Sequence, residues 1–407
     1  MMKTAWPVFA LVLLLTGCGG DDQQNPTPSA ISLVESVPVE TALGRDDIPD
    51  TRETWLSMLR GAEKSLDIAQ FYYANKDGEA LEEILRAVID AADRGVKVRV
   101  IGERKFYDTY PETLDRLQEH AGIDVRLYDI SELTGRGVHH AKYFVVDGRQ
   151  VFIGSQNWDW RALRHINELG AAITDIPIAT AFTHVFNFDW ALSEQRDIEE
   201  ASAAAGTITT SFPVVIEDSL GRHEITPVFS PRDLLPMGAL WDEDAIKELI
   251  SGARDSLKLQ LLSYRSYPSL ENALLQAAAR GVHVSLLLSD WSLGDAQQQD
   301  LQRLQRTENI SVRFTRIPEY SGGFISYARV EHCKYLLADD THAWIGTSNW
   351  SRSYFHSSRN AGVILHSPGL LRLLHAKYQQ SWEGPYAVQF DPTKTYEARV
   401  RDDGSGT

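Results

Sequence analysis

Cysteine and basic charge are both scarce in this chain of 407 residues. Cys18 and Cys333 are its only cysteines, so a buried core, and not a disulfide framework, has to hold the fold together. The 40 lysines and arginines are outnumbered by 56 aspartates and glutamates, which gives a formal net charge of −16. This balance argues against electrostatic capture of long nucleic-acid duplexes, but it leaves room for a small basic pocket that handles one phosphate at a time.

A long apolar run is also missing. The nearly apolar segment Val8–Leu15 is too short to span a bilayer as a permanent helix. It follows Lys3 and precedes Leu15-Thr-Gly-Cys18, so residues 1–18 resemble a bacterial lipoprotein signal sequence with Cys18 as the lipidated residue. Residues 19–30 then form a flexible tether. We expect a lipid-anchored protein of the bacterial cell envelope, at the outer membrane or periplasmic face. The alternative is an ordinary signal peptide with a chance cysteine.

The most informative feature present is a repeated eight-residue pattern, His-x-Lys-x4-Asp. It occurs once from His140 to Asp147 and again from His332 to Asp339. Each copy is followed by a turn, Gly154-Ser-Gln-Asn157 in the first and Gly346-Thr-Ser-Asn349 in the second. The offset is the same throughout, because 332 − 140 and 346 − 154 both equal 192. Two copies in register are far less expected by chance than one.

These residue types suit attack on a phosphodiester. One neutral histidine can act as the nucleophile, while a protonated one supplies the proton that the leaving oxygen needs. Two lysines, Lys142 and Lys334, can neutralise the non-bridging oxygens, and the amides of Asn157 and Asn349 can donate hydrogen bonds to them. In an extended strand His140 shares a face with Lys142, as His332 does with Lys334. The chemistry requires no metal, and we expect no cofactor.

The halves also share the order strand, amphipathic helix, strand. Leu81, Ile84, Leu85 and Val88 lie at the spacing of one buried helix face, and so do Leu270, Ala273, Leu274 and Ala277. Arg94-Gly95 and Arg280-Gly281 end these two helices, and an apolar strand follows each. We therefore predict an α/β fold of two similar halves, each a β-α-β-α sandwich, packed pseudo-symmetrically around one active-site cleft. The predicted boundaries are 31–200, 211–395 and a tail, 396–407, of which the part from Arg401 on is flexible.

Other residues near the motifs receive more modest predictions. Asp147 and Asp339 each begin a turn and are expected to support the site as anchors of that turn. Glu168 could orient a catalytic histidine, although its partner in register is Asn360, which weakens a symmetric version of this idea. His139 is expected to be only a neighbour of the site, and Cys333 a small buried filler.

The duplicated motif and its turns resemble those of the phospholipase D superfamily over residues 32–395. Further stretches, among them Asn157-Trp-Asp-Trp-Arg161 and Glu168-Leu-Gly170, are similar to one branch of it, which holds mammalian lysosomal phospholipase D-like 5′ exonucleases and poxvirus envelope proteins. The resemblance implies two phospholipase D-like halves and a phosphohistidine intermediate formed without metal. It also implies that His140 is the nucleophile and that His332 is the acid and later the base.

Two substrates remain open within this reaction class. The first is single-stranded nucleic acid, cut from its 5′ end, for which stacking surfaces are needed. The second is a glycerophospholipid, hydrolysed or exchanged at the membrane that the anchor would reach. A silent binding protein is disfavoured by the two intact motifs, and we predict no protein partner. Core packing is the more frequent role of aromatic residues, so it competes with stacking for every candidate: Tyr72, Tyr73, Trp158, Trp160, Trp350, Tyr354 and Phe355.

Overall fold

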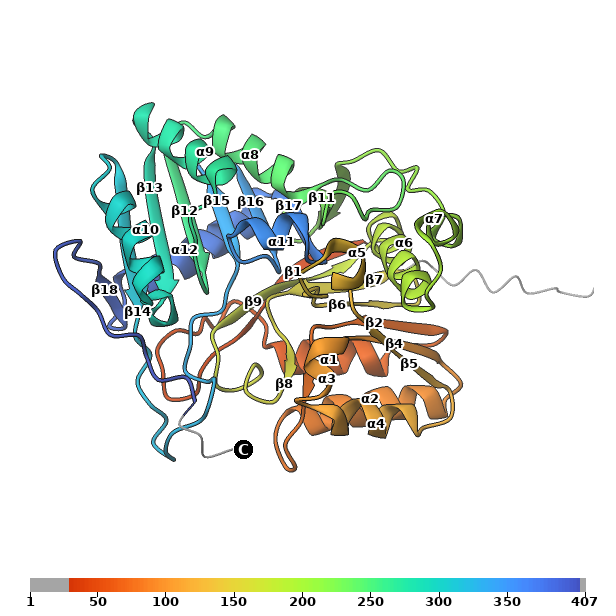
Figure 1. Ribbon diagram of the computed structural model, residues 1–407. Helices are drawn as coiled ribbons and strands as arrows, with labels where there is room; N and C mark the ends of the chain where they lie inside the picture. Colours follow the sequence, from red (N-terminus) through yellow and green to blue (C-terminus); the bar gives the residue numbers. More distant parts are fainter. Residues whose placement is uncertain (1–28, 403–407) are drawn as a thin grey trace, which may run out of the picture.

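The computed structural model of the protein describes residues 29–402. Within them, two mixed β-sheets are each built from one half of the chain, with helices packed on both faces (Figure 1). The predicted α/β class and the two similar halves are confirmed. The predicted signal sequence, Cys18 and residues 19–28 of the predicted tether lie outside the described residues.

The first sheet combines a parallel part with an antiparallel part. Strands β2, β4 and β5 run parallel, and β6, β7, β9 and β1 continue the sheet in antiparallel pairs. Its strand order, with bounds, is β1 (Ala30–Ser36), β9 (Glu168–Thr174), β7 (Gln150–Gly154), β6 (Tyr143–Val146), β2 (Ser65–Ala69), β4 (Lys97–Glu103) and β5 (Ile123–Tyr128). A short parallel pair, β3 (Tyr73–Ala74) and β8 (Trp158–Asp159), lies outside this sheet.

The second sheet repeats the same arrangement and extends it at both edges. Strands β12, β13 and β14 are its parallel part, and β15, β16 and β17 are its antiparallel part. In order, its strands are β10 (Val214–Asp218), β11 (Gly221–Ser230), β17 (Asn360–His366), β16 (His342–Gly346), β15 (Tyr335–Ala338), β12 (Ser256–Leu261), β13 (His283–Ser289), β14 (Ile310–Thr315) and β18 (Ala387–Gln389). The offset of 192 is kept strand for strand from β6 and β15 onward, because Tyr143, Gln150 and Glu168 correspond to Tyr335, His342 and Asn360.

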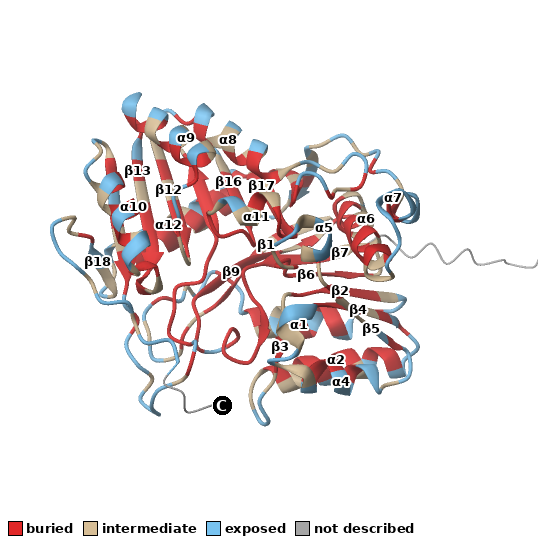
Figure 2. Ribbon diagram, in the orientation of Figure 1, coloured by how far each residue is buried: buried red, intermediate tan, exposed pale blue. Residues whose placement is uncertain are grey.

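The helices form outer layers on each sheet and a shared middle layer. The helices of the first half are α1 (Thr51–Arg60), α2 (Leu81–Asp93), α3 (Arg104–Tyr107), α4 (Pro111–Gln118), α5 (Ser131–Thr134), α6 (Ile176–Ser193) and α7 (Ile198–Ala205). Those of the second half are α8 (Asp242–Gly252), α9 (Pro268–Ala279), the 3-10 turn η1 (Asp290–Ser292), α10 (Asp295–Gln305), α11 (Arg352–His356) and α12 (Pro368–Glu383). Figure 2 shows that the outer helices bury the face toward their sheet and expose the other.

The helix patterns read from the sequence are largely confirmed. All four predicted positions of α2 are buried; in α9 Leu270, Leu274 and Ala277 are buried while Ala273 is only half-buried. Both helices end as predicted, since Gly95 and Gly281 follow them with φ angles of 91° and 94°, which non-glycine residues adopt at a cost.

One continuous apolar core joins the halves. Phe182 of α6 and Leu374 of α12 belong to the same buried cluster as Tyr143 of the first sheet and Tyr335 of the second. Because α6 and α12 occupy the middle layer, both sheets turn one face toward the same core. The two halves therefore share their interior, and this fixes the strand ends from which the site is built.

Two segments differ from what the sequence suggests. The small, polar stretch at the predicted junction contains α7, which packs on the core through Ala201 and Ala205. Part of the predicted tail is also held: the carbonyl of Arg401 accepts a hydrogen bond of 2.7 Å from the amide of Tyr327. Neither contact can be read from composition, because both depend on residues distant in the sequence.

Candidate active site

The two motifs meet where the halves meet. The backbone amide of His140 donates to the carbonyl of Arg359 over 2.8 Å, and that of His332 donates to the carbonyl of Asn167 over 2.9 Å. Each motif histidine is thus tied by its backbone to the opposite half. The sequence predicts that the strands begin at Lys142 and Lys334, but β6 and β15 begin one residue after the lysines. The His-x-Lys part of each motif is an extended segment that precedes its strand, so its backbone groups can form hydrogen bonds with the opposite half.

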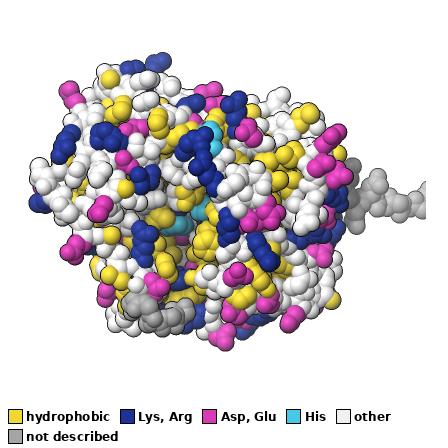
Figure 3. Space-filling view, in the orientation of Figure 1, with side chains coloured by type: hydrophobic (Ala, Val, Ile, Leu, Met, Phe, Trp, Pro, Cys, Tyr) yellow, Lys and Arg dark blue, Asp and Glu magenta, His cyan; other side chains and the backbone are white. Residues whose placement is uncertain are grey.

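Each lysine does share a side with its histidine, as the sequence predicts. The ammonium of Lys142 donates to the carbonyl of His140 over 2.8 Å, and that of Lys334 donates to the carbonyl of His332 over 2.6 Å. All four side chains are at most 10 % exposed, so the site is a nearly enclosed pocket. In Figure 3, histidine side chains lie in a hollow near the middle of the face, with hydrophobic side chains around them.

A chain of hydroxyl, acceptor and imidazole supports each histidine. In one chain, Ser155 Oγ donates to Glu168 Oε2, and Nδ1 of His332 lies 2.9 and 2.8 Å from the two carboxylate oxygens of Glu168. In the other, Thr347 Oγ1 donates to Asn360 Oδ1 over 2.9 Å. Nδ1 of His140 lies 3.0 Å from that same oxygen. Each orienting residue comes from the half opposite to its histidine.

The hydrogen bonds of Asn360 fix the tautomer of His140. The Asn360 amide nitrogen donates to the backbone carbonyls of Tyr354 and Ser358, so its oxygen is the acceptor that faces His140. Nδ1 of His140 must therefore carry the proton, and Nε2 is left with a lone pair. Burial, reinforced by the ammonium groups of Lys142 and Lys334, lowers the pKa of His140 well below its usual value. A neutral ring with a free Nε2 has the form that a nucleophile requires.

The pair of His332 and Glu168 behaves differently because its acceptor is ionisable. Burial raises the pKa of Glu168 well above its usual value. Burial, together with Lys334 and Lys142, lowers the pKa of His332. The pair consequently retains one proton and no net charge, whichever partner carries it. That stored proton is what a general acid needs.

The two lysines are buried, and among the described residues neither forms an ion pair with a carboxylate. Burial lowers the pKa of Lys334 to about 8, and burial together with the neighbouring Lys334 lowers that of Lys142 well below its usual value. Glu168 is the carboxylate that opposes both shifts. Such a site gains much from an anionic phosphate, which supplies the missing negative charge.

Asn157 and Asn349 stand at the same pocket, although their amide nitrogens already have protein partners. Asn157 Nδ2 donates to the hydroxyl of Tyr72 over 3.3 Å, and Asn349 Nδ2 donates to that of Tyr354 over 3.0 Å. The rings of Tyr354 and His140 meet edge to face, with 5.0 Å between their centroids. Each amide nitrogen keeps a second hydrogen, so both can still donate to a phosphate oxygen.

Asp147 and Asp339 lie at the far ends of their strands and not beside the histidines. The Asp147 carboxylate accepts hydrogen bonds from the backbone amides of residues 63–65, and the Asp339 carboxylate does so from residues 254–256. Both residues have positive φ angles, 54° and 51°. Their location agrees with the predicted role of turn anchors, which close the loop before β2 and before β12.

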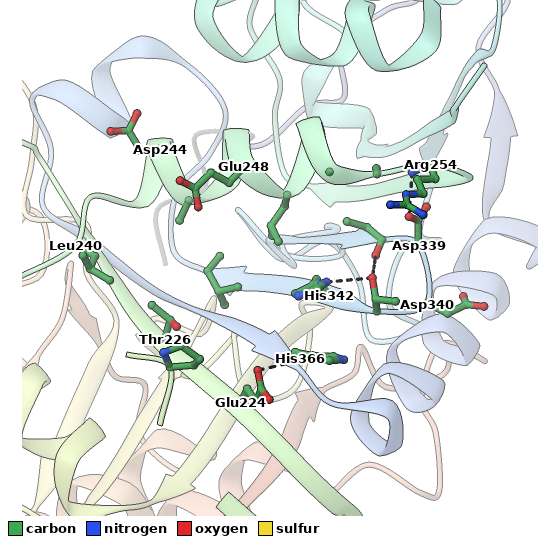
Figure 4. A pocket seen from close by; sticks show the side chains of 18 of the residues that line it. Glu224, Thr226, Leu240, Asp244, Glu248, Arg254, Asp339, Asp340, His342 and His366 are labelled. Atoms are coloured by element: carbon green, nitrogen blue, oxygen red, sulfur yellow. Dashed lines mark hydrogen bonds and ion pairs between the residues drawn. The ribbon is translucent and has the colours of Figure 1, made fainter. Parts of the chain in front are cut away.

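A large cavity of the described residues also lies away from the histidines. It measures about 900 Å³ and lies between α8 and the second sheet, with Asp339, His342 and His366 on its lining (Figure 4). None of the six motif residues His140, Lys142, Asn157, His332, Lys334 and Asn349 lines it. Volume alone therefore does not locate the site in this fold.

The remaining sequence predictions concern buried neighbours. Cys333 is fully buried with its thiol 3.6 Å from the carbonyl of Asn167, as expected of a filler. His139 is also buried, with Nε2 3.6 Å from Asp189. Asp189 in turn holds Arg359, the residue whose carbonyl receives the amide of His140. His139 is thus part of the frame behind the site.

Sequence reasoning missed three groups of residues. Asn360 was used only as an argument against two equivalent orienting residues, although its offset of 192 from Glu168 indicated that it lies behind the other histidine. Ser155 and Thr347, which lie within the conserved-offset turns, orient the two acceptors. A row of half-buried rings, here called the aromatic wall, was also missed apart from Tyr72, because its members lie far apart in the sequence: Phe71, Tyr72, Phe106 and Tyr110.

The aromatic wall starts at the site. The Phe71 ring lies 4.9 Å from that of His140 and the ammonium of Lys142 is 5.0 Å from it. Tyr72 stacks on Phe106 at 5.6 Å and on Tyr110 at 5.4 Å. Of the seven aromatic residues considered for stacking from the sequence, five are buried in the core, and only Tyr72 and Tyr354 are not.

Fold, repeat and paired motifs together define a phosphodiesterase of the phospholipase D type. The family model described as "Cardiolipin synthase, PLD-like domain" matches residues 55–190 and 246–382, one match in each half. The chain therefore belongs to the phospholipase D superfamily, and it is a phosphoric diester hydrolase.

Similar proteins with recorded names carry two activities. The chain is 30% identical to "5'-3' exonuclease PLD3" of Rattus norvegicus, over 96% of this chain and 90% of that protein. It is 27% identical to "Phospholipase D Z" of Dictyostelium discoideum, over 92% and 93%. Among solved structures, phosphatidylserine synthase of Haemophilus influenzae shares the fold with a TM-score of 0.63 and 13% identity, over 85% of this chain and 86% of that one. The comparisons confirm the resemblance expected from the motifs.

Proposed function

We propose that the protein hydrolyses phosphodiesters without a metal, through a phosphohistidine on His140. The observation that carries this proposal is the different acceptor behind each histidine. Asn360 holds His140 in the tautomer with Nε2 free, and burial lowers the pKa of that ring, whereas Glu168 and His332 jointly hold a proton. The two histidines are therefore suited to opposite tasks.

In the first step, Nε2 of His140 attacks phosphorus and the bond from phosphorus to the leaving oxygen breaks. His332 donates its proton to that oxygen, and Glu168 stabilises the ring. Lys142 and Lys334 compensate the charge on the non-bridging oxygens. In the second step, His332 takes a proton from water, the resulting hydroxide attacks phosphorus, and the bond to His140 breaks. Both histidines are then in their starting protonation states.

For the substrate, we propose single-stranded nucleic acid, cut from the 5′ end. The aromatic wall supports this choice, because partly exposed rings beside the nucleophile offer stacking faces for bases. The near-full-length similarity to a 5′-3′ exonuclease also supports it. The second candidate is a glycerophospholipid, because another relative is named a phospholipase D and an apolar wall also suits a lipid.

The test offers both substrates to the full-length protein in mild detergent, with a chelator present. The substrates are 5′-hydroxyl single-stranded DNA and mixed micelles of phosphatidylcholine and phosphatidylglycerol. His140→Asn is the control. Nucleotide release from the 5′ end that disappears in the variant supports the exonuclease. Headgroup release, or exchange with added alcohol, without nucleotide release would replace it by the lipid activity.

We also propose that Cys18 carries the lipid that anchors the protein in the bacterial envelope. The motif Leu15-Thr-Gly-Cys18 and the polar stretch after it support this. Cys18→Ser should move the protein from the membrane to the soluble fraction. Mass spectrometry of the N-terminal peptide should show a diacylglyceryl group in the wild-type protein but not in Cys18→Ser. An unmodified Cys18 would contradict the anchor.

A further inference from the structure

Aromatic and guanidinium groups continue from the wall onto a loop of the second half. Tyr110, the last ring of the wall, has the guanidinium of Arg161 5.7 Å from its centroid. The same guanidinium lies 6.0 Å from the ring of Tyr327, in the loop between β14 and β15. Arg161 therefore joins a ring of the first half to a ring of the second.

The line then reaches the C-terminal segment. Tyr327 meets Trp291 of η1 edge-on at 6.1 Å between centroids, and the guanidinium of Arg401 lies 4.9 Å from the Trp291 ring. In Figure 1, the loop after β14 and the C-terminal segment run together between the two halves, near the end marked C. We call this continuation the aromatic strip, and its members are Arg161, Tyr327, Trp291 and Arg401.

The rings of the strip are not core residues. Tyr327 is 41 % exposed and Trp291 is only half-buried, although both are large side chains on irregular segments. Arg401 is exposed as well. Partly exposed aromatic rings that lie 4.9–6.1 Å from the next group are what an adaptable stacking surface requires.

The loop that presents Tyr327 is held in a costly conformation. Tyr327 and Arg329 both have positive φ angles, 59° and 56°, which bulky residues rarely adopt. Two contacts oppose relaxation: Arg161 donates to the carbonyl of Ser326 over 3.2 Å, and the amide of Tyr327 donates to the carbonyl of Arg401. Backbone strain of this kind persists where the surroundings fix it, and it is concentrated at binding sites.

We propose that the aromatic strip binds the 3′ remainder of a single-stranded nucleic acid whose 5′ end occupies the pocket of His140 and His332. This inference rests on the proposed exonuclease. The strip is linked to the aromatic wall through Tyr110 and the buried Arg161, so the rings of the wall and of the strip can serve successive bases beyond the scissile phosphate. Arg401 supplies positive charge for a phosphate at the far end, in a chain whose net charge is −16.

If the strip binds nucleic acid, affinity for a long strand depends on the strip, whereas cleavage depends only on the pocket. A short substrate reaches only the pocket and the wall, whereas a longer strand also reaches Tyr327 and Trp291. The protein should therefore bind a twelve-nucleotide strand more tightly than a dinucleotide, and the difference should depend on the strip. Cleavage chemistry at the pocket should not depend on it.

The experiment measures KM and kcat of the full-length protein on a 5′-hydroxyl dinucleotide, on a twelve-nucleotide strand and on bis(p-nitrophenyl) phosphate. Trp291→Ala and Tyr327→Ala should each raise KM for the long strand about tenfold, the effect of one lost stacking contact. KM for the dinucleotide and hydrolysis of the chromogenic diester should remain unchanged. Trp291→Phe should restore most of the affinity, because it keeps a ring.

Trp190 offers a matched control. It is half-buried beneath the guanidinium of Arg126 at 4.4 Å, as Trp291 is beneath Arg401, but it packs on the core beside Phe186 of α6. Trp190→Ala should leave KM for the long strand unchanged. Thermal melting verifies that each variant is folded at the assay temperature.

The outcomes separate the strip from the exonuclease. Normal cleavage of the long strand with an unchanged KM in both strip variants would overturn the strip alone. Hydrolysis of the chromogenic diester without cleavage of any strand by the unmodified protein would overturn the exonuclease and the strip together. A KM that rises equally for the dinucleotide would show that the variants distort the pocket, which would also overturn the strip.

Discussion

The carboxylate of Glu168, which belongs to the first half, lies 2.8 Å from Nδ1 of His332, which belongs to the second. Because burial raises the pKa of Glu168, this pair stores a proton and stabilises the imidazolium when the ring carries it. The position related to Glu168 by the repeat is Asn360, an amide that cannot ionise. A nearly symmetric frame thus holds a chemically asymmetric pair.

Replacing Glu168 by Gln should lower kcat about 100-fold with a small change in KM, because His332 loses the anion that stabilises its protonated form. Without that anion the pKa of His332 falls further. The basic limb of the pH profile of kcat should therefore move to lower pH. Glu168→Asp keeps the charge and should retain more activity. An unmoved limb would show that Glu168 does not act through His332.

Replacing Asn360 by Asp introduces a carboxylate behind His140, and it should shift the pH profile upward, whereas Glu168→Gln shifts it downward. A neighbouring anion raises the pKa of the ring, so the nucleophile remains protonated up to higher pH. The acid limb of kcat/KM should shift upward, and activity at neutral pH should fall by about tenfold for each pKa unit above the assay pH. Asn360→Ala removes an acceptor that raises the pKa of His140, so it should lower activity and shift the limb slightly to lower pH, opposite to the Asp variant. A profile unchanged by Asp would argue against His140 as nucleophile.

The roles of the two histidines can be separated with a substrate whose leaving group needs no proton. With bis(p-nitrophenyl) phosphate, His332→Asn should release about one equivalent of p-nitrophenol rapidly and then turn over slowly. The first step proceeds without the acid, whereas the second lacks its base. Peptide mapping at alkaline pH should then find the phosphoryl group on His140. A burst in His140→Asn, with the label on His332, would reverse the assignment.

Asp147 should contribute to stability and not to catalysis. Its carboxylate accepts backbone hydrogen bonds from Glu63, Lys64 and Ser65, and its φ of 54° disfavours a residue such as alanine. Asp147→Ala should therefore lower the free energy of unfolding by roughly 2–4 kcal/mol. The kcat of the folded fraction should stay within about twofold. Urea titration and activity at low temperature measure the two quantities, with Asp147→Asn as the milder control. A large loss of kcat at unchanged stability would return Asp147 to the site.

The sequence predicts those parts of this protein that repeat. A constant offset of 192 places His140 with His332 and Lys142 with Lys334, and the apolar stretches that form β2, β4, β12 and β13 indicate the sheets. What the repeat cannot show is which half supplies each partner. That Glu168 orients His332 and not His140 depends on how the halves pack on their shared core, a property of residues far apart in the chain.

The aromatic residues illustrate the same limit. Trp158 and Trp350 stand beside the motif asparagines in sequence yet are buried in the outer cores. Phe106 and Tyr110 have no neighbouring motif yet line the approach to His140 through Phe71 and Tyr72. Burial of an aromatic ring is decided by tertiary packing, and a single sequence carries no periodic signal for a wall assembled from separate loops.

Binding of a phosphate analogue should be coupled to proton uptake. In the free protein, burial lowers the pKa of Lys334 to about 8 and also depresses the pKa values of Lys142 and His332. An anion in the pocket favours the charged form of each group and raises these pKa values again. At pH 8, tungstate should therefore bind with uptake of on the order of one proton. Calorimetry in two buffers of different ionisation enthalpy measures this number.

The pH dependence of the same binding follows from the sign of the shift. As pH rises through about 8, free Lys334 loses its proton, so each further pH unit should weaken tungstate binding, by up to about tenfold per coupled proton. Compared with the wild-type protein, Lys334→Met should bind tungstate more weakly and take up fewer protons on binding at pH 8. Lys258→Met, which removes a lysine of β12 that pairs with His375 outside the pocket, serves as the matched control and should behave like the unmodified protein. A binding enthalpy that is independent of the buffer would mean that Lys334, Lys142 and His332 are already protonated in the empty pocket. The assignment of a stored proton to His332 and Glu168 would then lose its electrostatic basis.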